Sequence, residues 1–147
     1  MKRVLSICMV GIMLISIATT ALADADIREF SFVLDGTIAS EGKYVVSSQT
    51  ATKYSSSYKY GSVRVTSWNG YQPNKNVYTG LTFQNCVPVC EFMWIYASKS
   101  LPQRVTPELN DPTLIGSQYK YCAAMRLNTV ETAATVKAAG IFTPDGR

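Results

Sequence analysis

The stretch Val89–Tyr96 reads Val-Cys-Glu-Phe-Met-Trp-Ile-Tyr and is the densest apolar run of the sequence outside its N-terminus. Its aromatic and β-branched residues suit the pleated surface of a β-sheet. Side chains alternate between the two faces of a strand, and both alternating sets of this run are mostly apolar. We therefore interpret the run as the central strand of a small β-domain, covered on each side.

Period-two alternation and turn residues mark further strands along the chain. They are expected near residues 30–34, 43–48, 58–68, 81–83, 119–128 and 134–142. Within residues 58–68 the pattern places Val63, Val65 and Ser67 on one face and Arg64, Thr66 and Trp68 on the other, as expected for a strand at the domain surface. A helix over residues 130–139 is an alternative, which its threonines and Val136 disfavour.

Three other segments lack a clear strand pattern. Residues 71–80 are interpreted as a loop, and residues 98–116, with three prolines, as a long connection. Residues 47–57 are too polar for a core and fit a flexible arm or a solvent-facing edge strand. Together these features predict an all-β fold, an antiparallel β-sandwich or small barrel of about six to seven strands.

The first 23 residues have the features of a secretory signal peptide. Lys2 and Arg3 precede an apolar run of about fifteen residues, and Ala21-Leu22-Ala23 supplies the small residues before cleavage. A retained anchor would need about 20 apolar residues. We expect cleavage after Ala23, or alternatively after Ala25, and a single secreted domain of residues 24–147. Contact with a membrane is expected only through the signal peptide.

The charge of the expected secreted domain is small. Without Lys2 and Arg3, the domain has twelve basic and ten acidic residues, a net charge of about +2. The basic residues are scattered singly along the chain. Proteins that bind nucleic acid or anionic membranes usually gather their basic residues in a patch. We therefore expect no nucleic-acid partner.

Three cysteines remain after cleavage, an odd number for an oxidising compartment. We expect a Cys90–Cys122 disulfide, with Cys86–Cys122 as the alternative, because either closes a long loop and would stabilise the fold by roughly 4 kcal/mol. The third cysteine is either buried or forms a disulfide-linked dimer. The sequence contains no histidine, so we expect neither a metal site nor a cofactor.

The candidate binding residues are aromatic side chains with amide neighbours in the middle of the chain. Flat rings give contact area at low entropic cost, and amides add hydrogen bonds. The residues that we select are Trp68, Tyr71, Asn74 and Tyr78. Routine packing on sheet faces is the alternative explanation for these aromatic residues.

Catalysis has little support in the residue pattern. Without histidine the common Ser-His and Cys-His pairs cannot form. Glu91 lies within the expected central strand, but a salt bridge to Arg64 or Arg126, or exposure at a strand end, explains it without catalysis. No catalytic residue is therefore expected.

Besides the signal peptide, two stretches of the sequence stand out. One is a Ser/Tyr-rich middle that leads to Val63-Arg64-Val65-Thr66-Ser67-Trp68 and a turn with Asn69 and Tyr71. The other is the ending Val136–Asp145, with its Gly-Ile-Phe-Thr-Pro-Asp close. With these features the sequence resembles a loose group of small secreted proteins of Gram-positive bacteria, a domain of unknown function. Some members are similar to lactococcin-type bacteriocins, and the resemblance implies no catalytic residue.

The sequence thus predicts a secreted, non-enzymatic binding module that contacts a protein or glycan at the cell surface or envelope. The alternative is a bacteriocin-like toxin that acts on competing bacteria.

Overall fold

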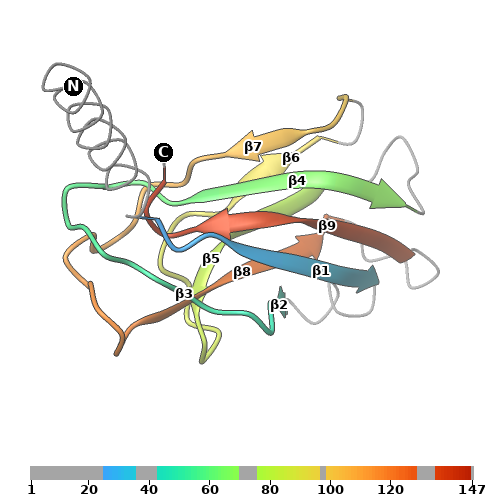
Figure 1. The fold of residues 1–147 in the computed structure, drawn as a ribbon. Coiled ribbons are helices and arrows are strands. Elements are labelled where there is room, and N and C mark those ends of the chain that lie inside the picture. Colours follow the sequence, from blue (N-terminus) through green and yellow to red (C-terminus); the bar gives the residue numbers. More distant parts are fainter. Residues whose placement is uncertain (1–24, 36–42, 70–75, 97–98, 129–134, 147) are drawn as a thin grey trace, which may run out of the picture.

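Two antiparallel β-sheets pack together in the computed structural model, which describes residues 25–35, 43–69, 76–96, 99–128 and 135–146 (Figure 1). The first sheet has the order β1 (Arg28–Asp35), β9 (Thr135–Thr143), β4 (Ser62–Asn69), β7 (Gln103–Val105). The second has the order β2 (Val45–Val46), β8 (Lys120–Leu127), β5 (Val77–Phe83), β6 (Met93–Ile95), and β3 (Ala51–Thr52) also pairs with β8. This confirms the predicted antiparallel β-sandwich. The described residues contain nine strands, because β7 lies in a segment expected to be a long connection and β3 in one expected to be a flexible arm or an edge strand.

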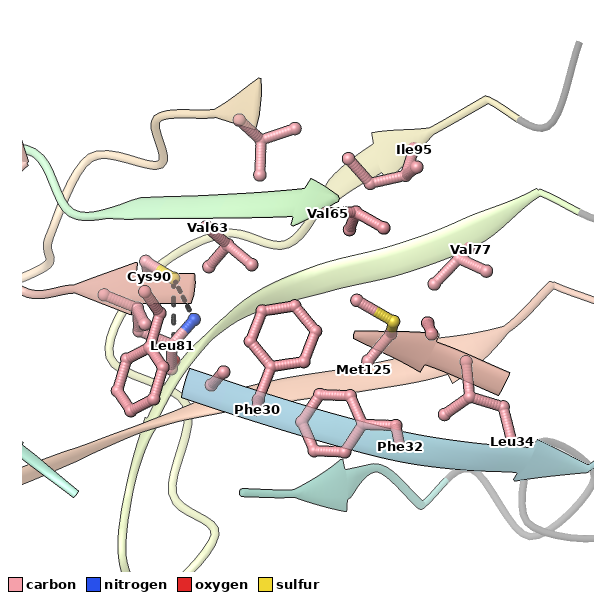
Figure 2. Packing of buried hydrophobic residues seen from close by; sticks show 14 of the residues in the cluster. Phe30, Phe32, Leu34, Val63, Val65, Val77, Leu81, Cys90, Ile95 and Met125 are labelled. Carbon is pink, nitrogen blue, oxygen red and sulfur yellow. Dashed lines mark hydrogen bonds between the residues drawn. The ribbon is translucent and has the colours of Figure 1, made fainter. Parts of the chain in front are cut away.

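The core lies between the sheets and is filled by alternate residues of the long strands (Figure 2). The first sheet contributes Phe30, Phe32, Leu34, Val63, Val65, Val136, Ala138 and Phe142, and the second Val77, Leu81, Tyr121, Ala123, Met125 and Leu127. Each large side chain stabilises the fold by about 1.5–3 kcal/mol through burial. Burial also raises the pKa of Tyr121 to about 12, and its hydroxyl donates to the Leu114 carbonyl at 2.7 Å.

A β-bulge in β4 changes which side chains face the core. The register with β9 shifts between Val65 and Ser67, and the Thr66 hydroxyl donates to the Ala139 carbonyl at 3.3 Å. After the shift Trp68 lies opposite buried Ala138 and packs against the core. The expectation that Trp68 shares a face with Arg64 and Thr66 is therefore wrong, because the bulge adds one residue and reverses the alternation.

The run Val89–Tyr96 is not a central strand. Within this run only Met93–Ile95 form a strand, β6. This strand lies at the edge of the second sheet, where it pairs with β5 alone. Upstream, Pro88 and Cys90 make only isolated bridges, since proline has no N–H for a continuous ladder. The inner strands are β9 and β4 in one sheet and β8 and β5 in the other.

Two further segments differ from the sequence interpretation. Strand β5 begins at Val77, within the expected loop, because residues 77–83 pair along their whole length with β8. In the segment 47–57, Ala51, Thr52 and Lys53 are buried, so part of it belongs to the interior. The expected strand near the C-terminus is confirmed by β9, which forms in place of the helical alternative over its described residues.

A fully buried ion pair joins this segment to the C-terminal end of the described chain. The side chains of Lys53 and Asp145 are both 0% exposed, and Lys53 Nζ lies 3.1 Å from Asp145 Oδ1. The ammonium also donates to the carbonyls of Tyr58 at 2.6 Å and Pro144 at 3.3 Å. The carboxylate accepts the Tyr54 N–H at 2.8 Å. The pair therefore has the additional hydrogen bonds that a buried ion pair requires.

Candidate binding site

The structure separates the predicted binding residues. Tyr78 lies on β5, with its side chain on the outer face of the second sheet, since its neighbours Val77 and Thr79 are buried. Trp68 packs against the core from the other sheet. Tyr71 and Asn74 lie outside the described residues. Of the four, Tyr78 alone is described on an outer sheet face.

Around Tyr78 the outer face carries a cluster that we name the aromatic face: Tyr44, Tyr78, Phe92, Trp94 and Arg126. Trp94 of β6 is the direct cross-strand partner of Tyr78, and their ring centroids are 3.5 Å apart. The Tyr44 and Phe92 rings are 4.4 Å apart. Such cross-strand aromatic pairs are typical stabilising contacts of a sheet face.

Arg126 connects the two ring pairs. It lies opposite Tyr78 on the neighbouring strand β8. Its guanidinium carbon is 5.0 Å from the Tyr44 ring centroid and 5.6 Å from that of Tyr78, within the range of cation–π attraction. The salt bridge considered between Arg126 and Glu91 is thus replaced by contacts with aromatic rings. All five side chains of the aromatic face are half-buried.

The small residue Gly80 gives Phe92 its position. A Cβ atom at Gly80 would lie 2.6 Å from Cδ1 of the Phe92 ring, so the ring rests directly on the backbone of β5. Across the ladder Gly80 faces Ala124, a second small residue. The sheet surface is therefore flat enough here for a ring to lie on it.

A cleft of about 540 Å³ opens beside the aromatic face. It is lined by Tyr78, Glu91, Phe92, Met93, Trp94, Tyr96, Thr106, Pro107 and Glu108. Four of these side chains are aromatic. Each of three other hollows on the described surface is lined by one aromatic side chain. The cleft thus combines ring faces with the carboxylates of Glu91 and Glu108, both exposed. This combination is suited to ligand binding.

Little in the residue pattern points to this site. Phe92 and Trp94 stand out in the run Val89–Tyr96, but the apolar density of that run predicts a covered central strand instead of an outer face. Tyr44 and Arg126 come from distant segments, and the Arg126 contacts with aromatic rings carry no local motif. The alternation of Phe92, Trp94 and Tyr96 is the one signal that could have identified a shared aromatic surface.

The three described cysteines are free thiols, so the predicted Cys90–Cys122 disulfide is not formed. Cys90 belongs to the core, where its sulfur accepts the Leu81 N–H at 3.1 Å (Figure 2). Cys122 alternates with core residues Tyr121 and Ala123 and faces the other side of the sheet. The sheet backbone therefore separates the two sulfurs.

Thiol reactivity should differ sharply between these positions. Burial raises the pKa of the Cys90 and Cys122 thiols, whereas Cys86 is exposed in the turn after β5. Since the thiolate is the reactive form, we expect iodoacetamide to modify Cys86 in the folded protein and the other two only after unfolding. Peptide mass spectrometry of native and denatured samples measures this. A disulfide between Cys90 and Cys122 in the native sample would contradict it.

Comparison of the chain with protein-family models, with curated proteins and with solved structures gives no match. Within the described ranges, no helix has the length and apolar character needed to cross a membrane. No group of three or more potential metal-binding side chains occurs among the same residues.

Proposed function

We propose that this chain is a secreted, non-enzymatic binding module that attaches to a component of the cell envelope through the aromatic face and its cleft. The observation that carries the proposal is the gathering of four aromatic side chains from separate segments on the outer face of the second sheet. Aromatic groups at a surface are enriched where proteins bind partners, because they supply large contact area with few rotatable bonds.

Two properties of the site and one of the sequence support this proposal. Tyr96 is 40% exposed at the cleft, so a ligand can reach it. The rings rest on a regular sheet and on one another, so little side-chain freedom remains to be lost on binding. The resemblance to small secreted proteins of Gram-positive bacteria points to a Gram-positive envelope as the first target to test.

Co-sedimentation with purified Gram-positive cell walls tests the proposal. We expect the wild-type protein to sediment with the walls and Tyr96→Ala to weaken binding by about 2–12-fold, the range that one aromatic contact supplies. Tyr54→Ala is the matched control, because Tyr54 is 57% exposed and lies outside the cleft. It should bind as the wild type does.

Two results would contradict the proposal. The first is a wild-type protein that stays in solution, and the second is equal weakening by both tyrosine substitutions. Growth inhibition of indicator bacteria by the wild-type protein would instead favour the bacteriocin-like alternative.

A further inference from the structure

We propose that the cleft recognises a cationic alkylammonium group on the ligand, an inference that rests on the proposed function and names the chemistry of its site. The charges of the lining residues give the first reason. Glu91 and Glu108 contribute two carboxylates, and the lining contains neither lysine nor arginine. Among the described residues, neither glutamate takes part in an ion pair. The lining itself is therefore complementary to positive charge, and Arg126 contacts the Tyr78 ring without lining the cleft.

The aromatic rings give the second reason. The face of an aromatic ring attracts a cation, most strongly where water is excluded, and alkylammonium groups are bound in this way. Tyr78, Phe92, Trp94 and Tyr96 all line the cleft. Rings beside carboxylates provide both the apolar contact that the alkyl groups require and the charge that the nitrogen requires. A neutral sugar has no charge for the carboxylates to attract, so rings and hydrogen bonds alone would be enough to bind it.

Lys99 gives the third reason, because it shows an ammonium group in contact with a ring of the cleft. Its Nζ lies 4.8 Å from the centroid of Tyr96, although Lys99 is not among the lining residues. A ligand cation at Tyr96 would compete with this lysine and would also be repelled by its charge. Removing Lys99 should therefore strengthen the binding of a cation and leave a neutral ligand unaffected.

Proton NMR titration with choline tests the inference on the secreted protein. The neutral isostere 3,3-dimethylbutan-1-ol has the same shape without the charge, and we expect choline to bind about tenfold more tightly. Glu91→Gln and Glu108→Gln should each weaken choline binding about threefold, since each removes one nearby charge. Lys99→Ala should strengthen it about twofold, with binding of the isostere unchanged in all three variants.

Glu29→Gln is the matched control, because Glu29 is exposed on the first sheet, outside the cleft. Circular dichroism checks that every variant is folded. Equal affinities for choline and its isostere would overturn the inference, and so would glutamate variants that bind choline as the wild type does.

The wall assay separates this inference from the proposed function. Walls that bind through Tyr96 without competition by choline would overturn the inference and leave the proposed function standing. Choline binding with the expected variant pattern, but no wall binding, would support the cation site and overturn the proposed envelope target.

Discussion

Asp145→Ala is expected to lower the free energy of unfolding by about 3–5 kcal/mol, the usual cost of removing one partner from a buried ion pair. Lys53 is 0% exposed, so its ammonium group would remain buried without its counter-ion. The backbone N–H groups of Tyr54 and Ser55 would lose their acceptor as well. The loss of these two part-buried hydrogen bonds adds to the destabilisation.

The reciprocal substitution Lys53→Met should also destabilise the protein. It leaves the carboxylate buried, but the N–H groups of Tyr54 and Ser55 still donate to it. In the double variant Lys53→Met/Asp145→Ala neither charge is left alone, so its loss should be smaller than the sum of the two single losses.

Urea unfolding followed by tryptophan fluorescence measures these differences. Lys59→Met is the matched control, since it is the same substitution at an exposed position in the same connection. Its unfolding midpoint should equal that of the wild type. If Asp145→Ala unfolded at the same urea concentration as Lys59→Met, the ion pair would have no stabilising role.

Strands β1, β4, β8 and β9 could be predicted because hydrophobic and polar residues alternate along them, whereas most of β5 falls in a segment expected to be a loop. Residues 30–34 show this pattern directly, and alternate residues of β1 are buried. Residues 119–128 were also predicted as a strand, although Tyr121 to Met125 of β8 are all buried. The period of two is a local property, so one sequence suffices to detect it. The number of short strands could not be predicted, because β3 is held in place by β8 rather than by its own pattern.

The run Val89–Tyr96 shows why apolar density alone does not locate the core. Apolar residues are needed in a buried strand, but they are also needed where rings pack on an outer face. The Phe92 ring packs on Gly80, which lies twelve residues earlier in the chain, and against the Tyr44 ring. These contacts depend on the pairing of strands, which the run itself does not encode.

The candidate site was predicted only at Tyr78. Trp68 was misplaced because the bulge at Thr66 reverses the alternation, and the sequence carries no signal for this extra residue. Lys53 was likewise missed as an interior residue. Its partner Asp145 lies 92 residues further along the chain, so the compensation for its charge appears only in the folded structure.

Gly140→Ala should destabilise the protein by about 3 kcal/mol or more, the upper range for an overpacked position. Gly140 lies in β9 between Phe30 of β1 and Val65 of β4. A Cβ atom there would overlap the backbone carbonyl of Arg64 and lie 2.9 Å from Cζ of Phe30. The carbonyl belongs to a paired strand beside the bulge, so it cannot move away without breaking the ladder.

Gly80→Ala is the informative comparison, because the added methyl group meets a side chain instead of backbone. The Phe92 ring is half-buried at the surface and can swing outward. We therefore expect a smaller loss of stability for Gly80→Ala in urea unfolding, together with weaker wall binding, since Phe92 would leave its position in the aromatic face. Equal losses of stability for the two variants would show that β4 yields to the added methyl group as easily as Phe92 does, and would refute the close backbone approach at Gly140.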